Sequence, residues 1–141
     1  MSESEYRHVT YESLDDGTIA RIKLNRPEMR NAQHRSMLVE LNEAFLRAEA
    51  DDTVRVVIFG GHGPMFSSGH DTGSKEMWEE LRGDNPHPSA TINGGTREGA
   101  ESLMLQEWHY FFQNTLRWRN LRKITVAQVH GGVYAAYPRR R

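Results

Sequence analysis

The chain has 141 residues, a formal net charge of -1 and no cysteine. This length suits a single domain with a sizeable core, and the near-neutral charge gives no indication of nucleic acid or an anionic membrane as a partner. The lack of cysteine excludes disulfides and thiolate metal sites. The first residues are polar and acidic, and no run approaches the roughly 18 apolar residues of a membrane helix, so we expect no signal peptide and a soluble, cytoplasmic protein.

The chain is predicted to open with a β-hairpin. Large residues alternate from Tyr6 to Glu12, and a second set recurs from Ile19 to Leu24. The Asp15-Asp16-Gly17 segment between them is typical of a hairpin turn. Pro27 ends the second strand, because proline lacks an N–H donor and has a fixed φ.

A helix is predicted from about Gln33 to Ala50, followed by a short strand from Val54 to Phe59. Apolar residues recur in the helix at steps of three and four, which defines one buried face: Met37, Leu38, Leu41, Ala44, Phe45 and Ala48. Five of its six residues, Val54 and Val56 to Phe59, are apolar, which favours a strand covered on both faces. Strand, helix and strand in this order predict a βαβ unit and an α/β fold.

The second half of the chain predicts further helices and one strand. A short helix is expected from Lys75 to Leu81, a flexible loop from Gly83 to Gly99, and a longer helix from Ser102 to Leu121. One side of that helix is expected to lie in the core: Met104, Trp108, Phe111, Phe112 and Thr115. Ile124 to Val129 predicts another buried strand.

Three segments could carry chemistry, and the first runs from Asn25 to Ala32. It is a rigid corner that places a basic side chain at the start of a helix, where the helix dipole and free N–H groups favour an anion. An ordinary turn with capping residues would have the same composition.

The second segment runs from Phe59 to Asp71, beyond the carboxyl end of the predicted buried strand, where α/β sheets place their ligands. Its small residues Ser67, Ser68 and Gly69 would let a ligand approach the backbone closely. A free backbone N–H there could stabilise a carbonyl oxygen that becomes negative, a contribution of roughly 3 kcal/mol. The alternative is a plain glycine-rich connector.

Other kinds of site fit these residues poorly. Ser68, His70 and Asp71 are too close in sequence to align as a hydrolase triad. The segment lacks the Gly-Lys-Ser/Thr ending of a phosphate-binding loop. His62, His70 and His130 do not have the spacing of metal ligands, so we expect no metal.

The third segment, Lys123 to Ala136, is a strand that leads into two glycines and small residues. Together the three segments resemble the enoyl-CoA hydratase/isomerase (crotonase) superfamily, over nearly all of the chain except 83–99. The first is similar to the family's N-R-P-x-x-x-N-A element, the second to F-[SC]-[AS]-G-x-D, and the third to K-P-x-[IV]-A-x-[VI]-x-G. The resemblance implies a ClpP/crotonase ββα spiral.

The resemblance also assigns roles to residues. The backbone N–H of His70 would be the first oxyanion-hole donor for a thioester carbonyl, Ala136 would stand at the second donor position, and Asp71 would stiffen the loop. The implied substrate- and CoA-binding residues are Met29, Arg30, Asn31, Ala32, Ser68, His70, Asp71 and Thr72. The implied partner is an acyl-CoA thioester with no separate cofactor, and relatives usually form trimers or hexamers.

The sequence departs from the family pattern after Ala136. The 137–141 tail contains a proline and three arginines, and Arg139 stands where hydratases carry their first catalytic glutamate. The second glutamate would lie beyond the last residue. We therefore expect residues 1–141 to form a single, partial crotonase-like domain, the amino-terminal portion, that is inactive as a hydratase.

Three functional hypotheses remain open. The chain is an acyl-CoA enzyme of this family seen as a fragment, a non-catalytic acyl-CoA binding or interaction module, or a non-functional truncated gene product. Glu76, Glu79 and Glu80 follow the second segment and could supply a base, although a solvated helix face is the favoured interpretation.

Overall fold

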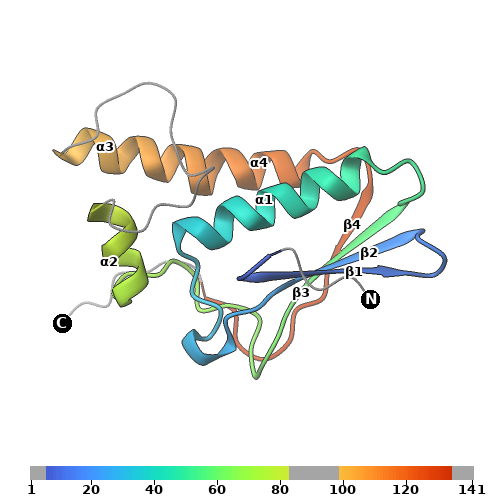
Figure 1. The fold of residues 1–141 in the computed structure, drawn as a ribbon, viewed down its shortest axis with the longest axis horizontal. Helices are drawn as coiled ribbons and strands as arrows, with labels where there is room; N and C mark the ends of the chain where they lie inside the picture. Colours follow the sequence, from blue (N-terminus) through green and yellow to red (C-terminus); the bar gives the residue numbers. More distant parts are fainter. Residues whose placement is uncertain (1–5, 83–98, 135–141) are drawn as a thin grey trace.

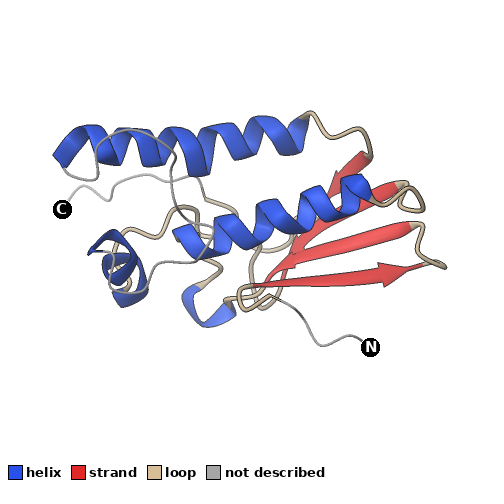
Figure 2. Ribbon diagram, turned by 45° about the horizontal axis from the view of Figure 1, so that its top comes forward, coloured by secondary structure: helices blue, strands red, loops and turns tan. Residues whose placement is uncertain are grey.

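The computed structural model describes residues 6–82 and 99–134, which form a four-stranded sheet covered on one face by helices (Figure 1). The strands are β1 (Val9–Leu14), β2 (Ile19–Leu24), β3 (Val56–Gly61) and β4 (Ile124–Ala127), in that order across the sheet. The helices are η1 (Pro27–Met29), α1 (Arg35–Ala50), α2 (Lys75–Arg82), α3 (Gly99–Gln106), η2 (Glu107–Gln113) and α4 (Asn114–Arg119). Figure 2 shows the sheet and the helices as two layers.

The opening β-hairpin is confirmed. β1 and β2 are antiparallel, with Val9 opposite Leu24. Asp15 and Asp16 both have a φ of 51° and Gly17 has a φ of 88°, the left-handed region that Asp and Gly accept more readily than other residues. The Gly17 N–H closes the turn by donating to the Leu14 carbonyl at 3.1 Å.

The βαβ unit is also confirmed, because β2 and β3 are parallel and α1 connects them. All six residues of the predicted apolar face of α1 are buried. All of them except Leu38, which packs with Val39 and Tyr110, lie in one cluster with inward-facing residues of the sheet: Val9, Ala20, Ile22, Leu24 and Val57. The Phe45 ring meets the Phe59 ring edge-on at 5.4 Å, so the best-buried part of the protein lies between α1 and the first three strands.

The long helix is confirmed, but its predicted inner face is wrong. α3, η2 and α4 follow one another beside α1 (Figure 1). Met104, Trp108 and Phe112 are exposed, whereas Tyr110 and Asn114 are buried. Thr115 is exposed and Phe111 half-buried. η2 is a π-helix, so the regular 3.6-residue pattern no longer predicts which side faces α1.

β4 is confirmed as a strand but not as a buried one. It pairs with β3 in parallel, and all four of its residues are exposed. Among the described residues β4 is one of the two edge strands of the sheet, and the helices cover only one face. For the same reason Val56 and Ile58, which point to the other face of β3, are only half-buried.

Three further predictions concern the short helix after the second segment, the segments 83–99 and 137–141, and membrane-spanning helices. The short helix after the second segment is found as α2, one residue longer than predicted. Residues 83–98, the main part of the predicted flexible loop, and the 137–141 tail lie outside the described residues. In the part of the chain that the structure describes, no helix is both long and apolar enough to cross a membrane.

Candidate functional site

The corner between β2 and α1 is a tight turn with unusual backbone geometry. Pro27 begins η1, and Arg30 and Asn31 follow with φ values of 54° and 53°. The Arg30 N–H donates to the Pro27 carbonyl at 3.0 Å, and the Asn31 N–H donates to the Arg26 carbonyl at 2.9 Å. Met29 and Arg30 are exposed, so the corner presents an apolar and a basic side chain to solvent.

Asn31 connects this corner to the loop after β3. Its side chain is fully buried, and its Oδ1 accepts a hydrogen bond from the Arg26 N–H at 2.9 Å. Its Nδ2 donates to the carbonyls of His62, Met65 and Phe66 at 2.8, 3.1 and 3.0 Å. The side chain is therefore committed within the protein, and any contact of Asn31 with coenzyme A would have to come from its backbone.

Arg26 and Asp71 form a buried ion pair between the corner and the second segment. The Arg26 Nη1 lies 2.5 Å from the Asp71 Oδ2, and both side chains are 3% exposed. The guanidinium also donates to the Ala32 carbonyl at 3.0 Å and to Glu76 on α2 at 3.1 Å. A buried guanidinium is stable only when acceptors pair with its N–H groups. Because these acceptors come from three segments, Arg26 fixes the corner, the loop and α2 relative to one another.

The Asp71 carboxylate is held in its charged form. Burial alone would raise the pKa of Asp71, but hydrogen bonds from Ser74 and Arg26 outweigh burial and lower the pKa to about 2. The Ser74 and Gly73 N–H groups donate to Oδ1 at 2.9 and 3.2 Å. A carboxylate with so many donors is a poor base, and its contacts are those of a residue that stiffens the loop.

The backbone N–H of His70 is directed away from the adjacent segment at Gln33. The Gln33 N–H donates to the Gly69 carbonyl at 2.8 Å, and the Asp71 N–H donates to the Gln33 carbonyl at 2.9 Å. This parallel bridge uses the groups on either side of His70 and leaves its own N–H pointing the opposite way. The His70 N–H has no hydrogen-bond partner within 6–82 and 99–134.

The third segment lies directly beside the second. The Phe66 N–H donates to the His130 carbonyl at 2.9 Å, and the Tyr134 N–H donates to the Ser67 carbonyl at 3.1 Å. Gly131 has a φ of 58° and packs so closely on the Pro64 carbonyl that a Cβ could not be accommodated. All three predicted segments therefore converge. Ala136, the predicted second oxyanion-hole position, lies outside the described residues.

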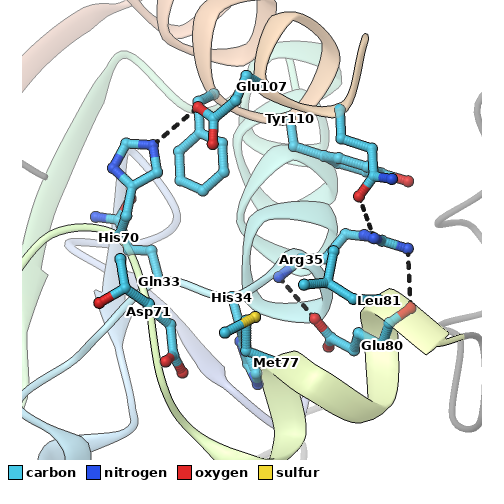
Figure 3. Close-up of a pocket in the computed structure, with 13 residues that line it drawn as sticks. Gln33, His34, Arg35, His70, Asp71, Met77, Glu80, Leu81, Glu107 and Tyr110 are labelled. Carbon is cyan, nitrogen blue, oxygen red and sulfur yellow. Dashed lines mark hydrogen bonds and ion pairs between the residues drawn. The ribbon is translucent and has the colours of Figure 1, made fainter. Parts of the chain in front are cut away.

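A cavity of about 510 Å³ opens beside His70, between α2, the start of α1 and the η2 region (Figure 3). Its lining combines polar residues with apolar and aromatic ones: Gln33, His34, Arg35, His70, Asp71, Thr72, Met77, Glu80, Leu81, Gln106, Glu107, Tyr110 and Phe111. The volume falls within the range of small-molecule sites. Of the predicted binding residues it contains His70, Asp71 and Thr72; Met29, Arg30, Asn31, Ala32 and Ser68 do not line it.

The family model for enoyl-CoA hydratase/isomerase matches residues 15–98, more than half of the chain. The chain belongs to this family. It is 59% identical over 133 residues to a Mycobacterium tuberculosis protein assigned as enoyl-CoA hydratase EchA13, covering 94% of this chain and 42% of the relative.

More distant members of the enoyl-CoA hydratase/isomerase family are also similar to this chain in sequence and in structure. Over 132 residues the chain is 37% identical to mouse mitochondrial Delta(3,5)-Delta(2,4)-dienoyl-CoA isomerase, covering 94% of this chain and 37% of that protein. The crystal structure of a probable enoyl-CoA hydratase from Mycobacterium smegmatis superposes with a TM-score of 0.67 at 34% identity, covering 88% of this chain and 41% of the other. The fold is therefore crotonase-like, and the chain spans about two fifths of the length of these relatives.

Two residues whose side chains accept hydrogen bonds from the first turn of α1 were not identified as site residues from the sequence. His34 is the N-cap of α1, and its Nδ1 accepts a hydrogen bond from the Met37 N–H at 3.4 Å. Glu80 on α2 accepts from the N–H groups of Arg35 and Ser36 at 2.9 and 3.0 Å. The expectation that Glu80 belongs to a solvated face is wrong, because the residue is 4% exposed and its carboxylate satisfies the free N–H groups of a helix end.

The other acids of α2 fit the solvated interpretation in part. The Glu76 side chain is 50% exposed and pairs with Arg26, and Glu79 pairs with Lys75 one helical turn away. The three histidines considered as metal ligands have separate partners. His62 contacts Thr10, His70 contacts Glu107, and His130 contacts the Gly63 carbonyl.

Two buried histidines predict a pH-dependent stability. Burial and the nearby Arg26 charge lower the pKa of His34 from 6.5 to about 4, and burial and the adjacent His34 lower the pKa of His8 to about 4. Between pH 6.5 and 4 the unfolded chain therefore binds more protons than the folded one, so the free energy of unfolding should fall across this window, by about 3 kcal/mol for His34 alone. Urea unfolding between pH 7.5 and 4 measures this.

A His34→Asn variant is the matched control for this pH dependence. Asparagine is a good N-cap and does not titrate in this range, so the variant should lose the His34 part of the slope. A free energy of unfolding that stays constant from pH 7 to 4.5 in the unmodified chain would contradict the prediction.

Proposed function

We propose that the chain binds an acyl-CoA thioester in the cavity beside His70, with the thioester carbonyl accepting a hydrogen bond from the His70 N–H. The observation that carries this proposal is an amide with no partner among the described residues, at the edge of a cavity of suitable size. Such a donor stabilises the negative oxygen of an enolate. Both relatives named above, EchA13 and the mouse isomerase, are named for reactions of CoA thioesters.

The surrounding contacts support a preorganised donor. Gly69 has a φ of 86°, a conformation natural only for glycine, and its N–H donates to the Ser67 Oγ at 3.1 Å. The Arg26–Asp71 pair holds the residue that follows His70. A donor that does not have to move as charge develops makes the largest contribution to such a reaction.

The CoA moiety is proposed to lie along the exposed corner. Arg30 is an exposed cation with no ion-pair partner in the described part of the chain, and it can pair with a phosphate. Met29 beside it is 40% exposed and offers apolar surface. Ala32 precedes Gln33 of the cavity lining, and the Ser68 N–H donates to the Arg30 carbonyl at 2.9 Å. The pantetheine chain is proposed to pass beside these two residues.

The proposed chemistry is enolate-type and needs no separate cofactor, since coenzyme A is part of the substrate. Hydration is expected to be slow or absent, because the resemblance places Arg139 where hydratases use a glutamate. Binding without any turnover would favour the non-catalytic module, and neither binding nor a folded chain would favour a non-functional product. A cytoplasmic location and assembly into trimers or hexamers stay predictions.

The test compares His70→Pro with His70→Ala in binding crotonyl-CoA labelled with ¹³C at the thioester carbon. Proline removes the N–H, whereas alanine keeps it. For the unmodified chain and for His70→Ala we expect binding and a downfield shift of the carbonyl signal, which reports a polarised carbonyl. His70→Pro should lose this shift and bind at least about tenfold more weakly. A carbonyl signal that is unchanged on binding to the unmodified chain would refute the proposed contact.

A further inference from the structure

The imidazole of His70 forms a side-chain pair with Glu107 on η2. The His70 Nε2 lies 3.3 Å from the Glu107 Oε2. The imidazole also stacks on the Phe111 ring, with centroids 3.6 Å apart and planes inclined by 19°. Figure 3 shows the pair at one side of the cavity, opposite Arg35 and Glu80. The loop at His70 and the η2 helix, more than 30 residues apart in sequence, thus contribute one hydrogen-bonded pair of polar side chains to the cavity.

Of the three carboxylates that line the cavity, Glu107 has the fewest partners among the described residues. Asp71 is saturated by Arg26, Ser74 and Gly73, and Glu80 is occupied by the start of α1. The Glu107 side chain is 63% exposed. Its Oε1 has no hydrogen-bond partner among the described residues, so this oxygen is available to a bound molecule.

We infer that Glu107 is a catalytic base for the α-carbon of a bound acyl thioester and that the His70 imidazole is the positioning residue that holds it. This inference rests on the proposed function, because the same residue, His70, donates its amide to the thioester oxygen. The α-carbon lies one bond from that carbonyl carbon. A carboxylate that is hydrogen-bonded to the His70 side chain is therefore placed near the α-proton of a thioester whose carbonyl oxygen is held by the His70 N–H.

The step is an enolisation. The α-C–H bond breaks, its electron pair moves into the new carbon–carbon double bond, and the carbonyl π pair moves onto the thioester oxygen, where the His70 N–H stabilises it. The proton goes to the Glu107 Oε1. The Nε2–H of His70 donates to Oε2 and keeps the carboxylate in place. Return of a proton from Oε1 to carbon restores the thioester, so the cycle needs no oxidant, reductant or second substrate.

The experiment follows exchange of the α-protons of butyryl-CoA in D₂O by ¹H NMR, with the full 141-residue chain. The unmodified chain should catalyse exchange. Glu107→Gln, which can keep the contact with His70 but has no basic oxygen, should lower the rate at least about 100-fold. His70→Ala should lower the rate about tenfold through misplacement of the carboxylate. Glu43→Gln on α1, which does not line the cavity, is the matched control and should leave the rate unchanged.

Binding and folding are measured alongside exchange. The Kd for butyryl-CoA and the far-UV circular dichroism of Glu107→Gln should match those of the unmodified chain. If the unmodified chain binds with a polarised carbonyl but does not exchange, or if Glu107→Gln exchanges normally, the base assignment is overturned while the proposed function stands. If butyryl-CoA does not bind at all, the proposed function itself fails.

Discussion

An Arg26→Met variant is expected to lose about 3–5 kcal/mol of its free energy of unfolding. Methionine is long enough to fill much of the same space, but it leaves the Asp71 carboxylate buried without the cation that lies 2.5 Å from it. It also removes the donors to the Ala32 carbonyl and to Glu76. Urea denaturation at pH 7, followed by tryptophan fluorescence and circular dichroism, measures the loss.

An Arg21→Met variant on β2 is the control for removal of a cation. Arg21 pairs with Glu12 across the hairpin, with side chains 32% and 36% exposed, and such a pair contributes about 1 kcal/mol or less. The double variant Arg26→Met with Asp71→Asn should recover part of the loss, since no buried charge is then left without a partner. If Arg26→Met is no more destabilising than Arg21→Met, the buried pair does not hold the corner and loop together.

The fold could be predicted from the sequence wherever the signal is local. The Asp-Asp-Gly turn, the apolar face of α1 and the strand β3 depend on residues close together in the chain, and the structure confirms each of them. The prediction that β3 is covered on both faces is wrong for the described residues, because Val56 and Ile58 on its second face are only half-buried. The predictions failed where a distant element decides which side is covered. The inner face of the long helix depends on how η2 meets α1, and the exposure of β4 depends on which surfaces cover the sheet.

The predictions about the site succeeded and failed for the same reason. The resemblance identified the three segments from the sequence, and the structure shows that they converge, because parallel pairing brings the ends of β3 and β4 to one edge of the sheet. The partners of individual side chains could not be predicted, because they lie far away in sequence. The sequence of α2 alone predicts a solvated Glu80, because its partners are N–H groups of α1. Glu107 contacts His70 only because η2 packs beside the loop. His34 could have been found, because a polar residue just before a helix is a candidate cap.

The second large effect is expected at Asn31, where an Asn31→Ala variant should lose about 5 kcal/mol or more of its free energy of unfolding. The substitution removes the donor to three carbonyls and the acceptor of the Arg26 N–H, all in a buried region, and each buried polar group left without a partner costs about 1–3 kcal/mol. Alanine must in addition adopt a φ of 53°, which costs about 1 kcal/mol. Chemical unfolding at pH 7 measures the sum.

Asn31→Gly separates these two contributions. Glycine loses the same hydrogen bonds but adopts the left-handed conformation freely, so it should be about 1 kcal/mol more stable than the alanine variant. Because the three carbonyls belong to the loop between β3 and His70, both variants should also bind crotonyl-CoA more weakly at a temperature where they remain folded. An alanine variant as stable as the unmodified chain would show that these carbonyls find other donors, and that the Asn31 side chain does not hold the loop in position.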